Sequence, residues 1–429
     1  MPTFVSRRSF LQSSLAAGVA GPLLLHSSGR AQENAASNRL NLAFIGVGTM
    51  GRGHVSRFLN FPDVQVVAIS DVVRERAEGA KETVEKKYAE ATKSGNYQGC
   101  KLYNDFREVL ARKDIDAVVI ATPDHWHATG CVLAAQAKKD IYCEKPLTHT
   151  IAQGQKIIDA VRGNKVVFQT GSQQRSEFGG KFRQAVEYVR NGRIGKLKTV
   201  RVGVGGPPVA CDLPEQEIPA GTDWNLWLGP AAERPYNEVL CPKGIHKHFP
   251  AWRNYKEFAG GALADMGAHH FDIAQWAMNM DGSGPVEIVP PEDAKAGSGL
   301  KFVYANGVEM FHGGPSGCTF EGSEGTIYVD RNKIESTPAK ILEEPLTDKD
   351  QRVYFSDSHA RNWLDCIRSR KDPICTAEIG ASSAAICHLG AIGYELRRPL
   401  KWDPDKKQFT GDEAANKLLD YTMRQPWKV

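Results

Sequence analysis

The stretch that decides the fold is LNLAFIGVGTMGRG, residues 40–53. Its first six residues are mostly apolar and have the length and the side chains of a buried strand. Gly46, Gly48 and Gly51 follow as G-x-G-x-x-G, at the point where a strand would turn into a helix. The first glycine permits the tight turn, the second lets backbone approach a pyrophosphate, and the third lets helix and strand pack closely. The helix N-terminus beyond them, at Thr49, offers unpaired N–H groups to the phosphates.

A second strand and an acidic residue strengthen this dinucleotide interpretation. Residues 64–70, VQVVAIS, form another apolar run, which ends at Asp71, 20 positions beyond Gly51. In dinucleotide-binding domains, a carboxylate about 20 residues after the glycine motif binds the adenosine ribose. Because a carboxylate repels a 2′-phosphate, Asp71 favours NAD over NADP, and Arg74 lies close enough to weaken that preference. An ordinary glycine turn is the alternative, but it does not account for the whole series.

Length and composition limit the classes of protein to consider. A chain of 429 residues is long enough for two domains, each with its own core. A net charge of +4, with 24% charged residues, indicates no basic face for nucleic acid. No run of 18 or more apolar residues appears, so we expect no membrane span.

The first 31 residues have the three parts of an export signal. SRRSFLQ at residues 6–12 is a twin-arginine pattern, an apolar run follows at 15–25, and Gly29-Arg30-Ala31 offers small residues for cleavage. The alternative is a tail with a chance Arg-Arg pair. We expect residues 1–31 to direct the protein to the twin-arginine export machinery and the periplasm. That route carries folded proteins, which suits a protein that acquires a cofactor inside the cell.

Strands and helices alternate through residues 39–171, which predicts a doubly wound parallel sheet. Further buried strands are expected at 115–122, 140–143 and 165–171, with residues 124–127 in a turn. Ligands of such sheets bind outside the carboxyl ends of the strands. Gly46, Asp71, Pro123 and Lys145 all stand at such ends. One crevice is therefore expected to collect them.

Residues 172–429 have a different rhythm. Strand-like runs at 197–204, 286–289, 300–304, 308–312 and 326–329 come with turns and few helices between them, and Asn306-Gly307 is a hairpin signal. This half predicts an α+β domain with a mostly antiparallel sheet. At least two helices are expected from His359 onward.

Two further stretches contain residues suited to acid–base chemistry. Lys145, at the end of a buried strand beside a dinucleotide, is suited to proton handling. Asp265, His269 and Asp272 fall at i, i+4 and i+7, so they share one face if a single helix begins at Asp265. A carboxylate beside an imidazole is a common arrangement for a general base. A capping Asp and a core-packed His are the alternatives. His269, His270 and Asp272 could also suggest a metal, but its other ligands would have to come from elsewhere, so no metal site is predicted.

Nine cysteines are scattered without C-x-x-C or a metal-like spacing. Cys131, Cys143 and Cys387 lie in apolar patterns, which indicates buried thiols. A bridge between Cys211 and Cys241 is left open by the sequence.

Taken together, these stretches resemble the Gfo/Idh/MocA oxidoreductases, the family of glucose–fructose oxidoreductase and inositol dehydrogenase. The resemblance covers nearly all of residues 40–429. It rests on the glycine loop at 46–51, ATPDHWH at 121–127, EKP at 144–146 and Asp265-x-x-x-His269. It implies a Rossmann domain followed by a domain whose open sheet carries the substrate face and often the interface of a homo-oligomer.

The resemblance also implies roles for individual residues. Lys145 would contact nicotinamide and substrate hydroxyl, His269 would be the general base and Asp265 would assist. A sugar or polyol C–H would give hydride to the nicotinamide while His269 accepts the hydroxyl proton. The expected NAD-binding residues, with NADP as the alternative cofactor, are Gly46, Gly48, Thr49, Met50, Gly51, Asp71, Arg74, Thr122, Pro123, His127, Glu144 and Lys145. Substrate-side candidates, which are amides, guanidinium groups and rings suited to hydroxyl-rich ligands, are Gln174, Arg175, Trp252, Arg253 and His270.

Export adds a constraint on the chemistry. NAD is not supplied outside the cytoplasm, so an exported enzyme needs a tightly held NAD that is reduced and reoxidised in one cycle. Two kinds of relative work in this way: oxidoreductases that pair two sugars, and NAD-dependent glycosidases that oxidise, eliminate, hydrate and reduce. Glu144-Lys145-Pro146 favours the oxidoreductase, because the glycosidases often depart from it. A non-catalytic sugar-binding protein is the third hypothesis.

Overall fold

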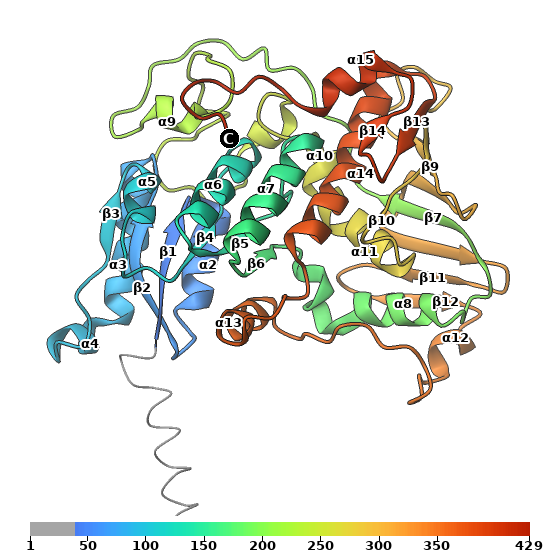
Figure 1. Cartoon of the computed structure of the whole chain (residues 1–429), viewed down its shortest axis with the longest axis horizontal. Coiled ribbons are helices and arrows are strands. Elements are labelled where there is room, and N and C mark those ends of the chain that lie inside the picture. The colour runs from blue at the N-terminus through green and yellow to red at the C-terminus, as the bar shows by residue number, and fades with distance from the viewer. Residues whose placement is uncertain (1–38) are drawn as a thin grey trace, which may run out of the picture.

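The computed structural model describes residues 39–429, and the predicted export signal lies outside them. Its N-terminal part is a six-stranded parallel sheet in the order β3-β2-β1-β4-β5-β6 (Figure 1). This is the strand order of a dinucleotide-binding Rossmann sheet, which confirms the predicted fold class. The strands are β1 (Leu40–Ile45), β2 (Val64–Ser70), β3 (Lys101–Tyr103), β4 (Ala117–Ile120), β5 (Asp140–Cys143) and β6 (Phe168–Thr170).

The structure of this part differs from the sequence prediction at the start of one helix and at one strand. The helices between the strands are α2 (Thr49–Phe58), α3 (Arg74–Lys87), α4 (Ala89–Lys93), α5 (Phe106–Leu110), α6 (Asp124–Gln136) and α7 (Ile151–Asn164). Residues 124–127, expected in a turn, form the first turn of α6, with Pro123 as its N-cap. Strand β3 was missed because it has three residues, none of them buried, and so lacks an apolar pattern.

The C-terminal part contains an eight-stranded sheet whose pairings are antiparallel, as predicted. Its long strand β10 pairs with β7, β9 and β11, so β10 joins the two ends of the sheet. The strands are β7 (Leu197–Gly203), β8 (Glu287–Val289), β9 (Lys301–Val303), β10 (Glu309–Gly322), β11 (Thr326–Val329), β12 (Ile334–Thr337), β13 (Leu400–Asp403) and β14 (Gln408–Phe409).

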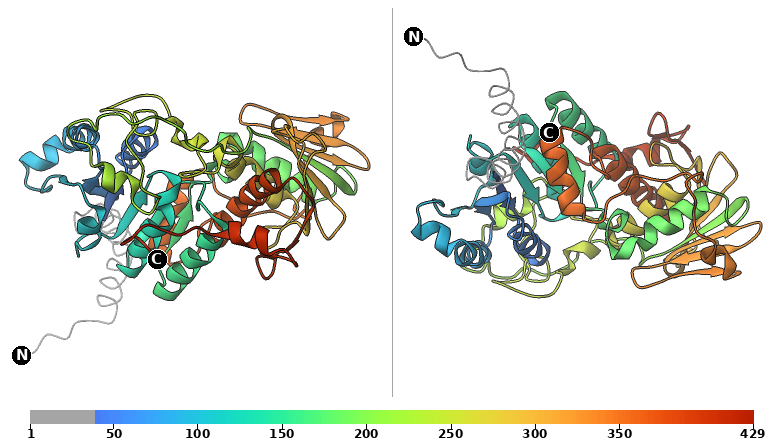
Figure 2. Two further views of the ribbon diagram at one scale, coloured as in Figure 1. Left: turned by 90° about the horizontal axis from the view of Figure 1, so that it is seen from above. Right: turned by 90° about the horizontal axis from the view of Figure 1, so that it is seen from below.

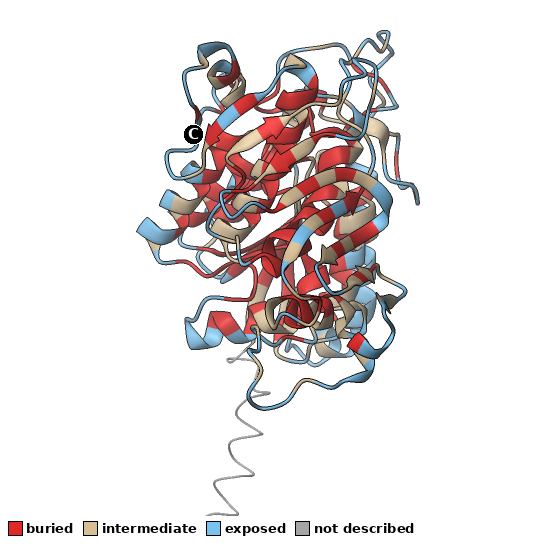
Figure 3. Cartoon of the chain, turned by 90° about the vertical axis from the view of Figure 1, so that its right-hand side faces the viewer, coloured by how far each residue is buried: buried red, intermediate tan, exposed pale blue. Residues whose placement is uncertain are grey.

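Helices cover one face of this sheet and leave the other face outward. Helices α8, α11 and α14 pack on the sheet and on one another. Figure 2 shows the strands at the end of the molecule that is farthest from the Rossmann sheet, and Figure 3 looks towards this end. The helices of this part are α8 (Lys181–Arg190), α9 (Trp224–Leu228), α10 (Gly261–Asp265), α11 (Gly267–Ala277), α12 (Lys340–Glu343), α13 (His359–Ser369), α14 (Ala377–Leu396) and α15 (Glu413–Asn416).

The end of the chain returns to the Rossmann part. Helix α13 contributes Trp363, which is fully buried, to the same hydrophobic core as β1 and β4. The last segment runs back above α6 (Figure 1), where Trp427 meets Trp126 edge-to-face with ring centroids 4.8 Å apart. The predicted boundary between residues 171 and 172 separates the two parts along the sequence. The hydrophobic core of the N-terminal part nevertheless also contains residues that follow residue 358.

All nine cysteines are free thiols, so Cys211 and Cys241 do not form a bridge. Cys131, Cys143 and Cys387 are buried, as expected. None of the helices within residues 39–429 is long and apolar enough to cross a membrane. In the same range there is no group of three or more His, Cys, Asp or Glu side chains placed to hold a metal ion.

Candidate active site

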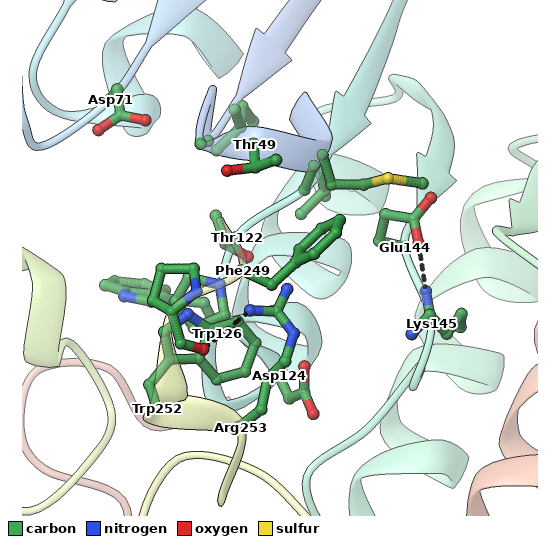
Figure 4. Close-up of a pocket in the computed structure, with 18 of the residues that line it drawn as sticks. Thr49, Asp71, Thr122, Asp124, Trp126, Glu144, Lys145, Phe249, Trp252 and Arg253 are labelled. Carbon is green, nitrogen blue, oxygen red and sulfur yellow. Dashed lines mark hydrogen bonds between the residues drawn. The ribbon is translucent and has the colours of Figure 1, made fainter. Parts of the chain in front are cut away.

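A cavity of about 420 Å³ lies at the carboxyl ends of the Rossmann strands and extends to the C-terminal part of the chain. Figure 4 shows Asp71 at one end and Lys145 at the other, with Thr49 and Thr122 between them. The structure thus brings the four predicted strand ends into one crevice. Its lining includes many of the predicted site residues: Gly46, Gly48, Thr49, Met50, Asp71, Thr122, Pro123, Glu144, Lys145, Trp252, Arg253, Asp265 and His269.

Each glycine of the loop meets a different steric demand. Gly46 has φ +81°, a left-handed conformation that favours glycine, and a Cβ there would lie 2.8 Å from the Ala121 carbonyl oxygen. A Cβ on Gly48 would meet nothing within 4 Å, so the backbone there is open to a ligand. A Cβ on Gly51 would lie 2.1 Å from the Gly46 oxygen, because helix and strand touch. No side chain caps the N-terminus of α2, so the loop fits a pyrophosphate.

Asp71 stands where the adenosine ribose of a dinucleotide would lie. Its two carboxylate oxygens accept hydrogen bonds from Val47 N at 2.7 Å and Val73 N at 2.8 Å. Burial raises the pKa of Asp71 above its ordinary value, against the charge of Arg76. Arg74 lies outside the cavity lining, exposed and ion-paired with its helix neighbour. Arg76, two residues further along α3, lines the cavity in its place.

Glu144 and Lys145 directly follow β5 at the other end of the cavity. His54 Nε2 lies 2.7 Å from Glu144 Oε1, and Gln173 Nε2 donates to the same oxygen at 2.8 Å. Burial alone would raise the pKa of Glu144, but the hydrogen bond and charge of His54 outweigh it and lower that pKa. Glu144 also accepts from Lys145 N at 3.2 Å, so it holds the backbone of this loop (Figure 4).

Lys145 and Asp265 form the central ion pair. Lys145 Nζ donates to Asp265 Oδ1 at 2.7 Å and to the Asp265 carbonyl oxygen at 2.8 Å. Burial would raise the pKa of Asp265, yet Lys145 and then Arg253 outweigh it and hold that pKa below its ordinary value. Asp265 thus remains a carboxylate. A lysine and a carboxylate from the two halves of the chain meet in one site.

His269 lines the cavity beside this pair and is 4% exposed. Its Nδ1 is buried and has no hydrogen-bond partner among the described residues. Burial, and next the charge of Lys145, lower the pKa of His269 well below its ordinary value. The imidazole is therefore neutral at pH 7 and has a lone pair that can accept a proton.

The cavity, its glycine loop and its charged end agree with what sequence comparison finds. Residues 40–172 match the model of the oxidoreductase family's NAD-binding Rossmann fold, and residues 209–429 match the model of its C-terminal alpha/beta domain. The chain belongs to the Gfo/Idh/MocA oxidoreductase family. The matched Rossmann domain is an NAD-binding one, and the glycine loop and Asp71 both lie within it.

Individual relatives are distant. Myo-inositol 2-dehydrogenase of Thermotoga maritima is 23% identical over 389 residues, which are 84% of this chain and 98% of that protein. Inositol 2-dehydrogenase of Salmonella typhimurium is 32% identical over 182 residues, 42% of this chain and 49% of that protein. Aldose-aldose oxidoreductase from Caulobacter crescentus, solved with glycerol, is 18% identical, with a TM-score of 0.56 over 85% of this chain and 99% of that chain. Levoglucosan dehydrogenase with NADH and levoglucosan is 19% identical, with a TM-score of 0.57 at the same coverages.

The helical pattern that starts at Asp265 is broken, which changes the predicted grouping. Asp265 ends α10, and α11 begins at Gly267 after Met266. Asp265 forms its ion pair with Lys145, and among the described residues no hydrogen bond joins its side chain to His269, so its expected assisting role stays a prediction. Asp272 turns into the core, where Arg175 binds it bidentately at 2.8 Å for both contacts.

Several residues predicted to touch a ligand lie behind the cavity wall. Arg175 is 1% exposed and fully engaged with Asp272 and Asp281. His270 and Gln174 are 2% and 1% exposed, with Gln174 Nε2 donating to the His269 carbonyl oxygen at 3.3 Å. The remaining residues outside the lining are Gly51, which packs against Gly46, and His127, whose ring nitrogens contact the carbonyl oxygens of Thr122 and Pro146.

A segment that no sequence motif indicated, residues 242–250, covers part of the cavity, and we name it the strap. Thr49 Oγ1 donates to the His248 carbonyl oxygen at 2.8 Å, so the strap rests on the glycine loop. Arg76 Nε donates to the Gly244 carbonyl oxygen at 2.9 Å and anchors the strap to α3. The strap has no motif, and only folding places it over a loop almost 200 positions earlier.

Within the strap, His246 and Phe249 line the cavity. His246 Nε2 is buried without a hydrogen-bond partner in the described part of the chain, while Arg52 donates to the His246 carbonyl oxygen. Phe249 faces the guanidinium of Arg253, which lies 5.1 Å from its ring centroid and 4.1 Å from that of Trp252 (Figure 4). Trp252 and Arg253, both predicted from the sequence, thus form one wall of the site.

Proposed function

We propose that the protein is a sugar or polyol oxidoreductase that keeps its NAD bound throughout the catalytic cycle. The observation that carries this proposal is the meeting of Lys145, Asp265 and His269 in the cavity that the glycine loop opens into. The names of its relatives, inositol and levoglucosan dehydrogenases and an aldose-aldose oxidoreductase, support a polyhydroxylated substrate.

The residues of the site can divide the work of oxidising a hydroxyl group. NAD, when bound, takes up or returns the hydride of the substrate carbon. Lys145 Nζ has three N–H donors and gives two to Asp265, which leaves one for the substrate oxygen. Neutral His269 accepts the hydroxyl proton and returns it in the reverse direction. Asp265 orients Lys145 and keeps its charge balanced.

Retention of the cofactor rests on the strap and on the N-terminal sequence. The strap closes over the glycine loop through Thr49 and Arg76, so it has to open before a dinucleotide can leave. Residues 1–31 would send the folded protein, with its NAD, through the twin-arginine machinery to the periplasm. A retained cofactor is then reduced by one sugar and reoxidised by another.

A second candidate, an NAD-recycling glycosidase, is favoured by Asp124. This residue begins α6, lines the cavity and is 4% exposed. Burial raises its pKa to about 8 against the charge of Arg253, so it holds a proton at pH 7. A neutral carboxylic acid can protonate a departing alcohol. The intact Glu144-Lys145-Pro146 favours the oxidoreductase, and the intact Lys145 and His269 disfavour a non-catalytic sugar-binding protein.

The outward face of the C-terminal sheet supports a homo-oligomer as part of this proposal. Along β10 the buried Met310 and His312 alternate with Phe311, which stays partly exposed on the outward face beside Arg201. Light scattering of the purified protein would measure the mass, and a monomer at all concentrations would refute this assembly.

The decisive experiment is to purify the protein after export, denature it and measure NAD(H) and NADP(H) in the supernatant by absorbance and mass. We expect close to one NAD(H) per chain and turnover of sugar pairs without added cofactor. Lys145→Met should keep the NAD and lose turnover. Release of an aglycone from glycosides would instead establish the second candidate. A protein that neither contains nor binds NAD would refute both.

A further inference from the structure

Arg331 lies at the tip of the hairpin between β11 and β12 and reaches the substrate end of the cavity. The turn that presents it is well fixed. Asp330 Oδ1 accepts hydrogen bonds from Asn332 N and Lys333 N, both at 2.7 Å, and Asp330 N donates to the Lys333 carbonyl oxygen at 3.0 Å. The position of Arg331 is therefore set by backbone geometry, not by a flexible loop.

The guanidinium group of Arg331 is held on two sides. Its Nε donates to Gln174 Oε1 at 3.0 Å, and its Cζ lies 4.9 Å from the ring centroid of Phe178. These contacts fix the plane of the group and leave its two terminal nitrogens for a ligand. Among residues 39–429, no carboxylate forms an ion pair with Arg331, whereas Arg57, also in the lining, is paired with Glu177.

The charges around Arg331 leave this end of the cavity cationic. Lys145 and Arg253 share the single carboxylate of Asp265, at 2.7 Å and 3.6 Å. Asp124 does not compensate, because burial raises its pKa to about 8 and keeps it neutral at pH 7. Glu144 stays a carboxylate, held by His54 and Gln173. The cations at this end therefore outnumber the carboxylates by three to two. A bound NAD brings a further positive charge on its nicotinamide ring.

We propose that the substrate is a sugar or polyol that carries an oxyanion, a carboxylate or a phosphate, and that Arg331 binds this group through its two terminal nitrogens. A preorganised guanidinium matches the planar or tetrahedral oxygens of such groups in a bidentate manner. A neutral hydroxyl group does not need a fixed, half-buried cation. The inference deepens the proposed function, since the hydroxyl that reacts at Lys145 and His269 belongs to the same molecule.

The test is equilibrium binding by calorimetry to the complete, NAD-containing protein. Three matched sets of ligands are compared: glucose with glucuronate and glucose 6-phosphate, and the corresponding galactose and mannose sets. The variants are Arg331→Gln and Arg331→Lys, which keeps the charge but loses the fork. The matched control is Lys333→Gln, which removes a cation from the same turn and lies outside the cavity lining.

We expect at least one carboxylate or phosphate to bind more tightly than its neutral parent, and Arg331→Gln to reduce that preference by about 10- to 100-fold, the worth of a bidentate charged contact. Arg331→Lys should fall between, and Lys333→Gln should match the wild type. The ratio within a set guards against a general loss of structure, which would weaken both members equally. The anionic group that gives the larger gain in affinity over the neutral parent, carboxylate or phosphate, identifies the oxyanion.

Neutral parents that bind as well as their anionic partners in every set would overturn the inference, as would a failure of all anionic ligands to bind. Turnover measurements distinguish a failure of this inference from a failure of the proposed function. Oxidation of neutral sugars alone would leave the oxidoreductase standing and remove the oxyanion. Arg331-dependent binding of anionic sugars without any reduction of the cofactor would support the oxyanion and refute the oxidoreductase.

Discussion

The strap predicts that NAD(H) leaves slowly and that Arg76 controls the rate. Arg76 is 6% exposed, and its guanidinium donates to the carbonyl oxygens of Gly244 and Pro242 at two points of the strap. Arg76→Met removes both hydrogen bonds while keeping most of the side chain's apolar volume. The strap should then open more often, and the dinucleotide should dissociate faster.

The size of the effect follows from these two contacts. Hydrogen bonds from a charged donor contribute about 1.5–3 kcal/mol each, which gives roughly 3–6 kcal/mol for the pair. Gly244 is buried and Pro242 is half-buried, but most of the strap is exposed, so water reaches the freed carbonyl groups once the strap opens, and the lower end, about 3 kcal/mol, is the expected cost of closure. At about 1.4 kcal/mol for each factor of ten, the dissociation rate should rise roughly 100-fold.

Stopped-flow fluorescence can measure this rate. Trp126 and Trp252 line the cavity, so excitation transfer from tryptophan to bound NADH reports its departure when excess NAD is added. The matched control is Arg74→Met, because Arg74 lies in the same turn of α3 but is exposed and paired only with Glu78. A change of less than threefold in the Arg76 variant, or an equal change in the control, would refute the view that the strap gates release.

Three further predictions concern the site and its surroundings. Replacing His269 with Gln should lower kcat by about 10²- to 10⁴-fold, the contribution of a general base, with the NAD content unchanged, and steady-state rates beside the cofactor assay would show this. Arg175→Met should lower the free energy of unfolding by about 3–5 kcal/mol by leaving Asp272 buried without its partner, while KM stays the same; a raised KM in a protein of normal stability would return Arg175 to the substrate site. The pKa of Asp124 is about 8 when folded and about 3.8 when unfolded, so the folded state holds an extra proton between these values and stability falls as pH rises across the window. Melting temperatures from pH 5 to 8 should therefore decline less steeply in Asp124→Asn, and parallel curves would contradict the raised pKa.

The sequence by itself determined the Rossmann part of the protein and the NAD end of its site. The reason is that this information is local: an apolar run, three glycines and an acid stand within about 30 positions, and each element uses its immediate neighbours. Lys145, His269 and Asp265 were identified as site residues by a motif, without knowledge of how they meet. The sequence also indicated Trp252 and Arg253, which the structure places in the cavity wall.

Only the tertiary structure decided which partners those residues have. Asp265 pairs with Lys145, 120 positions earlier, and a helical periodicity contains no information about such a contact. Arg175 lies in the core and Arg331 lines the cavity, although neither arginine belongs to a sequence motif that distinguishes it from the other. Burial and charge pairing depend on residues far away in the sequence, 97 positions for Arg175 and Asp272 and 120 for Lys145 and Asp265. The strap over Thr49 and the packing of Trp427 on α6 depend on still longer separations. Composition and spacing fix which groups are available, whereas the folded backbone fixes which of them are left without a partner and so face the ligand.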